Sequence, residues 1–335
     1  MTRYVALKGV LALAFGLFLS TGAQAQLFRT YVAPEGVDGN PCTLAAPCRL
    51  LPAALATVID GGEIWMLGSA NYNTSPVNIN KSVTILAIPG ALGSVVAIGG
   101  NAIVINTANV KVALRNLVIV PFIGGGGTGG INMTSGDSLT VADCLVANIT
   151  GGGINVSGVT NLLVTDTTIR GNSGWGLIVQ NGAKATITRT TISGNGTTGI
   201  YVAGNVASTT TADIADSTFS TNNYGVYVES AASGAIVKVS VRDSQVNRNL
   251  NTGITASSAT GSTVTVSASD NIISNNSTGI LSEAPGARVW ASGNTVSGNS
   301  TGLQNSAGLL QSTGDNAVRN NTTQFTGGIT LVPRT

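Results

Sequence analysis

Seven asparagines recur at intervals of 22, 23 or 27 residues through the second half of the chain: Asn172, Asn195, Asn222, Asn249, Asn276, Asn299 and Asn321. After most of them, a few residues on, comes a glycine followed by an apolar residue. A period of about 20–50 residues indicates a stacked array, in which each unit buries its apolar face against its neighbours. The repeat therefore constrains the architecture before any single residue is considered.

Two further columns share this period. The residue six positions before each asparagine is usually an aspartate: Asp166, Arg189, Asp216, Asp243, Asp270, Gly293 and Asp315. The residue midway between is apolar: Ile169, Ile192, Phe219, Val246, Ile273, Val296 and Val318. A polar, apolar, polar pattern at fixed offsets predicts that one short buried segment lies between two turns in every unit.

The units are predicted to be built from strands. They are rich in Gly, Asn, Thr, Ser and Val, which are poor helix formers, and this excludes helical repeats. Each unit holds three short alternating segments, for example residues 162–165, 167–169 and 177–179, with a turn at 171–174. Three strands per unit, each paired with its counterpart one unit later, predict an all-β parallel β-helix.

In these repeats the chain resembles the right-handed parallel β-helix proteins of the pectin-lyase-like superfamily. The pattern D-x-x-I-x-x-N-x-x-(x)-G-I carries the resemblance, clearly over about residues 139–330 and more weakly back to residue 83. The resemblance implies a three-sheet solenoid of about ten turns, with the asparagines in a tight turn between the second and third sheets. We expect each asparagine to adopt the left-handed conformation and to hydrogen-bond to the next one.

The N-terminus predicts export. Arg3 and Lys8 precede an apolar stretch at residues 9–20, and Ala23-Gln24-Ala25 is typical of a signal-peptidase site, so residues 1–25 are expected to be removed after Ala25. The apolar stretch is too short for a membrane span. We expect a protein that is secreted, periplasmic or on the cell surface.

Residues 26–62 are expected to form a cap on the β-helix of residues 63–335. Thr30–Val32 is predicted to be a strand, and Arg49–Ile59 is predicted to be a helix that ends at two glycines. The resemblance implies that this helix plugs the open end of the solenoid, which would otherwise expose its core and a row of unpaired backbone groups.

The three cysteines divide into a pair and a single residue. Cys42 and Cys48 flank a short loop in a chain expected to be exported, so a local disulfide is predicted, with two free thiols as the alternative. Cys144 has no partner in the pattern, and we expect it to be a small buried filler.

The charge balance points away from charged polymers. Charged residues are 9% of the chain, and loss of Arg3 and Lys8 with the signal peptide leaves 14 basic residues against 14 acidic ones. A net charge of zero argues against nucleic acid as a partner and against steering of a strongly charged polymer.

The aspartate column has two interpretations. Asp216 and Asp243 are expected on consecutive turns of the solenoid, about 5 Å apart, where they would be candidate calcium ligands. Alternatively, each aspartate caps the turn backbone that follows a strand. Arg189 and Gly293 in the same column favour the turn interpretation, and we predict no cofactor.

Superfamily members that cleave or epimerise polysaccharides have their active site on the outward face of the first sheet. Alternation gives this face mostly small hydroxyl residues, with Asp213 and Arg242 on neighbouring turns and Trp290 further along. The paired aspartates and histidine of the glycosidase relatives are absent, and the chain has no histidine. Arg242, together with Asp213 and Asp243, is a reduced version of the basic residue and acidic calcium ligands that the lyase relatives use. The alternative is a surface ion pair of little energetic value.

Tyr201 and Tyr227 are expected at equivalent outward positions on adjacent strands of the third sheet. Stacked exposed aromatics are a platform for a sugar ring or a partner chain. Alternatively, they are ordinary cross-strand packing beneath long loops at residues 203–211 and 229–235.

Three functions are compatible with these features. The first hypothesis is an exported, non-catalytic binding or structural protein, with polysaccharide as its ligand. The second is a polysaccharide lyase or epimerase that uses Arg242 and Asp213, with calcium at Asp216 and Asp243. The third is a subunit of a surface assembly, joined through the last strand at residues 329–332.

Overall fold

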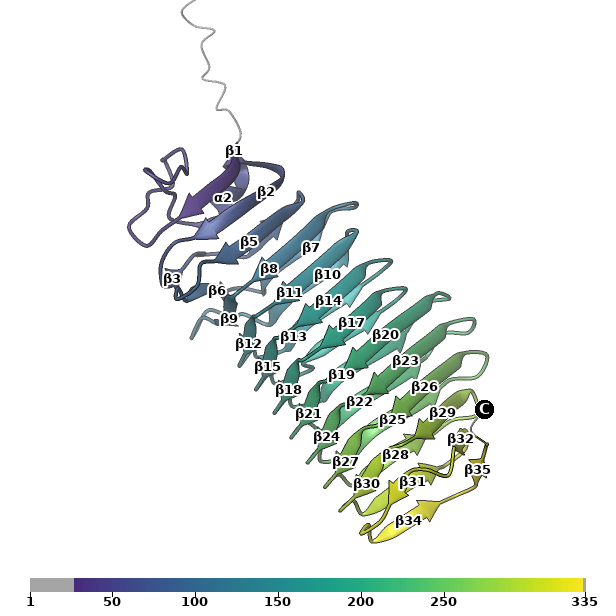
Figure 1. The fold of residues 1–335 in the computed structure, drawn as a ribbon. Coiled ribbons are helices and arrows are strands. Elements are labelled where there is room, and N and C mark those ends of the chain that lie inside the picture. Colours follow the sequence, from purple (N-terminus) through teal and green to yellow (C-terminus); the bar gives the residue numbers. More distant parts are fainter. Residues whose placement is uncertain (1–26, 334–335) are drawn as a thin grey trace, which may run out of the picture.

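The computed structural model describes residues 27–333, which form one long right-handed parallel β-helix (Figure 1). Three sheets run its whole length, with 13, 11 and 11 strands, and each named strand pairs in parallel with its equivalents one turn of the solenoid away. We call each complete turn of the solenoid a coil. The all-β fold and its three sheets are confirmed, and two sheets of 11 strands agree with about ten coils. The predicted signal peptide lies outside the described residues.

Sheet A begins each coil. Its strands are β1 (Leu27–Val32), β2 (Val58–Met66), β5 (Val83–Ala87), β8 (Lys111–Arg115), β11 (Ser138–Ala142), β14 (Asn161–Thr165), β17 (Lys184–Thr188), β20 (Thr209–Ala215), β23 (Ile236–Arg242), β26 (Thr263–Ser269), β29 (Ala287–Ser292), β32 (Leu309–Ser312) and β35 (Ile329–Leu331).

Sheet B follows after a tight turn. Its strands are short: β3 (Ala70–Asn71), β6 (Gly93–Ala97), β9 (Leu117–Pro121), β12 (Leu145–Ala147), β15 (Thr168–Arg170), β18 (Thr191–Ser193), β21 (Thr218–Ser220), β24 (Gln245–Asn247), β27 (Ile272–Ser274), β30 (Thr295–Ser297) and β33 (Ala317–Val318).

Sheet C closes each coil. Its strands are β4 (Val77–Ile79), β7 (Asn101–Asn106), β10 (Gly129–Ser135), β13 (Gly152–Ser157), β16 (Leu177–Gln180), β19 (Thr198–Gly204), β22 (Tyr224–Ser230), β25 (Thr252–Ser258), β28 (Thr278–Ser282), β31 (Thr301–Asn305) and β34 (Thr323–Thr326).

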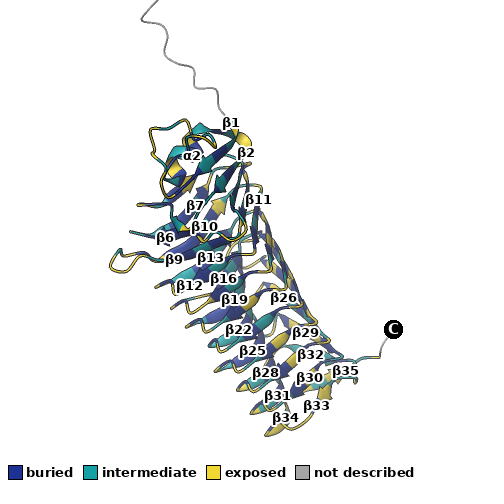
Figure 2. Ribbon diagram, turned by 60° about the vertical axis from the view of Figure 1, so that its left-hand side comes forward, coloured by how far each residue is buried: buried dark blue, intermediate teal, exposed yellow. Residues whose placement is uncertain are grey.

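A continuous apolar core fills the solenoid (Figure 2). Side chains alternate along each strand, so every second residue points inward and stacks on its equivalent in the next coil. Phe219 and Ile192 are fully buried neighbours in the midway column of sheet B. Burial of one such side chain contributes about 1.5–3 kcal/mol, and the stack repeats that contribution in every coil.

The N-terminal end is closed by β1 and by the one helix of the described chain, α2 (Leu51–Thr57), which carries proline near its N-terminus and buries Leu51, Ala54 and Leu55 against the core. The helix is shorter than the predicted Arg49–Ile59 because strand β2 has already begun at Val58. The predicted disulfide between Cys42 and Cys48 is confirmed. No helix within residues 27–333 is long and apolar enough to cross a membrane.

The asparagine ladder is confirmed in the turn between sheets B and C. Each buried amide bonds to the next: Asn249 Nδ2 donates to Asn276 Oδ1 at 3.0 Å, and Asn249 Oδ1 accepts from the Asn222 backbone N–H at 3.1 Å. The expected left-handed conformation is wrong, however. It belongs to the residue before each asparagine, such as Arg248 with φ of 55°. The left-handed residue turns the chain so that the following amide points inward.

A second ladder lies in the turn between sheets A and B. The aspartate column supplies its left-handed residues, with φ of 51° at Asp216 and at Asp243, and the next residue points inward. These inward residues are Cys144, Thr167, Thr190, Ser217, Ser244, Asn271, Asn294 and Asn316. Most of them accept a hydrogen bond from the backbone N–H of their equivalent in the preceding coil. The turn interpretation of the aspartates therefore has a geometric basis.

The glycine after each asparagine is required by close packing. A Cβ on Gly225 would lie 2.6 Å from the carbonyl oxygen of Gly253 and 2.9 Å from Asn249 Nδ2. Those distances are shorter than any real carbon contact, so a side chain here would push adjacent coils apart. The repeating glycines are thus a consequence of the asparagine ladder beside them.

The 27-residue intervals lengthen strands. Strands β19 to β26 in sheets A and C have seven residues, whereas β16 has four and β17 has five. The long loops expected at residues 203–211 and 229–235 are largely absent, because β19 runs to Gly204 and β20 starts at Thr209.

Candidate functional site

Asp213 and Arg242 both point outward from sheet A, on β20 and β23, as alternation predicts. Asp213 Oδ1 accepts a hydrogen bond from Ser240 Oγ at 2.8 Å. Arg242 forms its ion pair with Asp243, where Nη1 lies 3.2 Å from Oδ2. The two candidate catalytic side chains are therefore engaged with other partners.

The candidate calcium ligands Asp216 and Asp243 lie in the turn after sheet A. Both have the left-handed backbone conformation that this turn needs, and that conformation explains why aspartate occurs there. Across residues 27–333, no group of three or more Asp, Glu, His or Cys side chains is placed to hold a metal ion. In the same column, Arg189 forms a two-pronged ion pair with Asp166, at 2.8 Å in both contacts. That contact lowers the pKa of Asp166 to about 2.

A line of cations runs along the edge of sheet A at which its strands begin. Its four members occupy one register column, on β8, β17, β23 and β29, and all are exposed: Lys111, Lys184, Lys238 and Arg288. We call this set the basic line. Sequence reasoning missed it because the outward face was mapped from positions further along each strand. The basic line could have been found in the sequence from a cation immediately before the inward apolar residue of a strand, as in Lys238-Val239.

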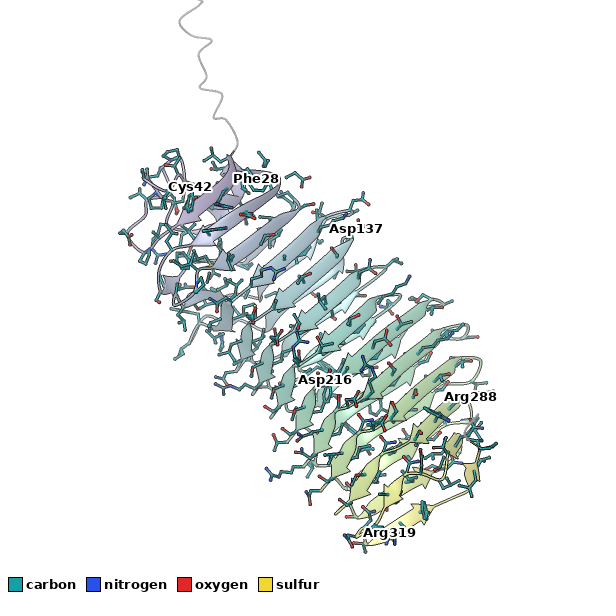
Figure 3. The ribbon with its side chains drawn as sticks, viewed as in Figure 1. Phe28, Cys42, Asp137, Asp216, Arg288 and Arg319 are labelled. Carbon is teal, nitrogen blue, oxygen red and sulfur yellow. A yellow bond between two sulfur atoms is a disulfide. The ribbon has the colours of Figure 1, made fainter. Side chains whose placement is uncertain are left out.

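The aspartate column runs parallel to the basic line on the opposite edge of sheet A. Figure 3 shows Arg288 where its strand starts and Asp216 after the end of its own. Asp243 lies five positions after Lys238, which is about 17 Å of extended chain. Because charges are screened over about 8 Å at physiological salt, a ligand beside the basic line interacts mainly with the charges on that edge. These include the exposed Asp137 as well as the four cations. The balanced net charge conceals this polarity.

The basic line borders two shallow hollows on sheet A. One has a volume of about 430 Å³ and is lined by Lys184, Leu163 and Asp213, among others. The other, of about 330 Å³, contains Lys111, and the two share Ser138 and Thr140, so they are adjacent; we call the two hollows together the groove. Further along the face, Trp290 lies two residues after Arg288 and is 37% exposed.

Tyr201 and Tyr227 are cross-strand neighbours on sheet C, as predicted, with ring centroids 6.0 Å apart. Two aromatics that the sequence did not single out extend them. Trp175 lies 6.5 Å from Tyr201, and Tyr224 meets Tyr227 edge-on at 5.0 Å. Together with Thr198 and Glu229 they line a pocket of about 240 Å³, which we call the aromatic pocket.

Glu229 gives the aromatic pocket a negative charge. Its Oε2 accepts a hydrogen bond from the Tyr201 hydroxyl at 3.1 Å. Burial, with the nearby Glu229 carboxylate, raises the pKa of Tyr201, and the same two causes raise the pKa of Tyr227 to about 12. Both phenols therefore stay protonated at neutral pH.

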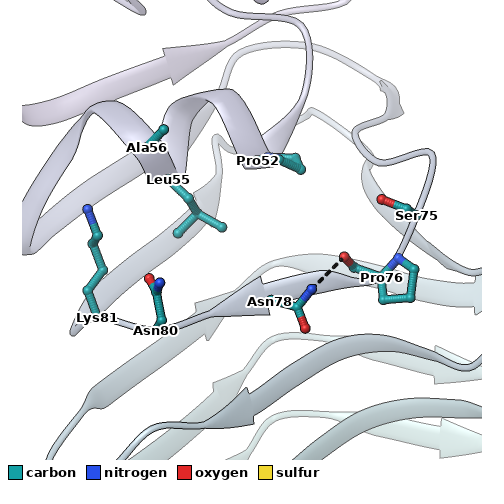
Figure 4. Close-up of a pocket in the computed structure, with 8 residues that line it drawn as sticks. All are labelled: Pro52, Leu55, Ala56, Ser75, Pro76, Asn78, Asn80 and Lys81. Atoms are coloured by element: carbon teal, nitrogen blue, oxygen red, sulfur yellow. Dashed lines mark hydrogen bonds between the residues drawn. The ribbon is translucent and has the colours of Figure 1, made fainter.

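Other features of the surface carry less chemistry. A hollow of about 390 Å³ between α2 and residues 75–81 contains one charged side chain, Lys81, whose Nζ donates to the Val58 carbonyl at 2.8 Å (Figure 4). Cys144 is buried as predicted, which raises its thiol pKa to about 12.

At the C-terminal end of the solenoid, β33 to β35 leave Phe325 and Leu331 exposed around a hollow of about 500 Å³. Self-association through this edge stays a prediction.

A family model described as a right-handed β-helix region matches residues 101–267. The chain has the pectin-lyase-like β-helix fold. Among solved structures, this β-helix is similar to pectate lyase Pel9A, with a TM-score of 0.57 and 14% identity over 84% of this chain and 78% of that one.

Two other solved structures share the fold. One is the A-module of the mannuronan C-5 epimerase AlgE6 from Azotobacter vinelandii, with a TM-score of 0.52 and 13% identity over 82% of this chain and 92% of that one. The other is XylC in complex with xylose, with a TM-score of 0.53 and 9% identity over 85% and 69%. A search of curated protein sequences finds no match. Identities this low establish the fold alone.

Proposed function

We propose that this β-helix binds an acidic polysaccharide along the outward face of sheet A. The observation that carries the proposal is the basic line beside a groove. In strands β5 to β29 of this sheet, the side chains include six cations, and Asp213 is the one acid. A balanced net charge does not exclude an acidic polymer as the ligand, because the charges are not evenly spread over the molecule.

The spacing of the basic line suits a linear polymer. Lys184, Lys238 and Arg288 follow one another at intervals of two coils, which is about 9.6 Å at the usual distance between strands. That distance is close to the length of a disaccharide, so carboxylates on alternate sugars would meet successive cations. Trp290 offers an apolar ring face to a sugar near Arg288.

The proposed role is binding rather than catalysis. Asp213 and Arg242 are held by Ser240 and Asp243 instead of facing a common point. We also propose that the protein acts outside the cytosol, which the Cys42–Cys48 disulfide supports because such bonds persist in oxidising compartments. The fold neighbours that are named as a pectate lyase and a mannuronan epimerase make polysaccharides the first ligands to test.

The test is calorimetric titration of the mature protein with oligogalacturonate and oligomannuronate, and with neutral xylo-oligosaccharides as the comparison. We expect the acidic oligomers to bind more tightly and their affinity to fall as salt rises. Replacing Lys184, Lys238 and Arg288 together by glutamine should weaken binding by roughly tenfold or more, since each exposed charge pair is worth up to about 1 kcal/mol.

A matched control separates the basic line from overall charge. Arg170, Arg248 and Arg319 are exposed cations outside sheet A, and their triple glutamine variant has the same net charge. Equal weakening in both triple variants, a preference for neutral oligomers, or equally tight binding of DNA would each contradict the proposal. Release of shortened, unsaturated sugars would instead support the lyase hypothesis, and inversion at C-5 without cleavage would support the epimerase hypothesis. Arg242→Ala would then test either one.

A further inference from the structure

The aromatic pocket lies on sheet C, whereas the basic line lies on sheet A, and nothing in the acidic-polysaccharide proposal uses it. Its four rings come from three successive coils, at Trp175, Tyr201, Tyr224 and Tyr227, and Glu229 is on the same strand as the last two. Ordinary cross-strand packing explains the contact between Tyr201 and Tyr227. It does not explain a carboxylate beside four rings that leave a pocket of about 240 Å³ between them.

We propose that the aromatic pocket binds an organic ammonium group. The faces of Trp and Tyr rings attract a cation that lies within about 6 Å of the ring centroid. Neighbouring centroids here are 5.0 to 6.5 Å apart, so one cation can lie within that range of several rings at once. Glu229 then supplies the opposite charge at the rim of the same pocket.

The charge of Glu229 is not neutralised by the protein. The three ion pairs found in residues 27–333 join Arg29 to Glu63, Arg189 to Asp166, and Arg242 to Asp243, all away from this pocket. The Tyr201 hydroxyl fixes one carboxylate oxygen, and the described residues offer no donor to the other, Oε1. A half-buried carboxylate in this setting gains more from a cation than from a neutral hydroxyl.

A second acid strengthens the field. Glu283 is exposed immediately after β28, two coils beyond Glu229, and the two carboxylates add to burial in raising the pKa of Tyr227. The pocket therefore combines apolar ring faces, phenol hydroxyls and the Glu229 carboxylate, with the Glu283 carboxylate outside its lining. A quaternary ammonium such as choline and the protonated amine of an amino sugar share the chemistry that fits it.

The experiment is calorimetric titration of the mature protein with choline, with its uncharged isostere 3,3-dimethylbutan-1-ol, with glucosamine and with N-acetylglucosamine. We expect each charged ligand that binds to do so about tenfold more tightly than its neutral counterpart. Binding of choline alone assigns a quaternary headgroup, and binding of glucosamine alone assigns an amino sugar. Binding of both supports a general ammonium site.

Variants separate ring faces from charge. Glu229→Gln keeps the shape of the side chain and should remove the preference for the charged ligand. Tyr227→Leu should weaken binding about tenfold, whereas Tyr227→Phe, which keeps the ring face, should retain most of it. Asp270→Asn is the matched control, because it removes an acid from the turn column on another part of the surface. Thermal unfolding of each variant verifies that the fold is intact.

The proposal is overturned if charged and neutral members of each ligand pair bind equally, if none of the four binds, or if Glu229→Gln leaves the preference unchanged. None of these results bears on oligogalacturonate binding at sheet A. The two proposals therefore fail separately.

Discussion

The two turns on either side of sheet B have the same backbone design but use different polar side chains. Each places a left-handed residue next to an inward polar residue, and each stacks that polar residue on the coils above and below. The turn after sheet B uses asparagine in seven consecutive coils. The turn before it uses Cys144, then threonine and serine, and changes to asparagine at Asn271.

The difference lies in how far each side chain reaches. Asn249 accepts from Asn222 and donates to the Phe219 carbonyl in the preceding coil, and it also donates to Asn276 in the following one. Ser217 accepts from the Thr190 backbone N–H of the preceding coil but donates to Ala215 in its own coil. An amide therefore links three coils and a hydroxyl links two. Amide ladders should make the stack more cooperative than hydroxyl ladders do.

The largest expected effect tests this contrast. Asn249→Ala removes four buried side-chain hydrogen bonds and should lower the free energy of unfolding by about 3 kcal/mol, whereas Ser217→Ala should lower it by about 1 kcal/mol. Urea titration followed by circular dichroism measures both. Equal losses in the two variants would mean that side-chain reach does not distinguish the ladders.

A smaller effect is expected at the left-handed residues. Asp243→Ala puts an ordinary side chain at φ of 51°, which costs roughly 1–2 kcal/mol, while Asp243→Gly should avoid that strain. The same urea titration applies, with Asp213→Ala as the control in a regular strand. If the alanine and glycine variants are equally stable, the aspartate column has a role other than its backbone conformation.

The smallest expected effect concerns the one ion pair that links two members of this column. Arg189→Ala should raise the pKa of Asp166 from about 2 toward the ordinary value near 3.9, because the guanidinium that favours the carboxylate is lost. The stabilising contribution of this pair is present above pH of about 4 and disappears as pH falls toward 2. Carboxyl NMR titration of both proteins measures the shift, and an unchanged pKa would assign the depression to Thr165 instead.

The interior was predictable because its constraints repeat. The ladder asparagines, the midway apolar column and the three strands of each coil recur at fixed offsets, so one coil predicts the next. The prediction failed where the same pattern has two backbone solutions. Either Arg248 or Asn249 could have been the left-handed residue, and the sequence favoured asparagine on propensity alone.

The candidate sites were predicted only in part. Tyr201 and Tyr227 were paired correctly because each lies two residues after the glycine of its repeat, Gly199 or Gly225. Trp175 and Tyr224 were missed because Thr198 lies between them in their column, so no two adjacent coils repeat an aromatic residue there. Glu229 was missed because Ala203 and Ser257 occupy its position in the two neighbouring coils. The basic line was missed because its members are two or three coils apart, separated by serine, asparagine and threonine.

By itself the sequence determined the fold class, the two polar columns and the disulfide, since each rests on local spacing that any stacked coil must satisfy. The tertiary structure decided which exposed residues become neighbours. The register between strands is fixed by the inward packing of residues such as Phe219. Exposed side chains take the positions that this register gives them and do not help to set it. Lys111 and Arg288, far apart in the chain, thus lie on one line because the core between them stacks in register.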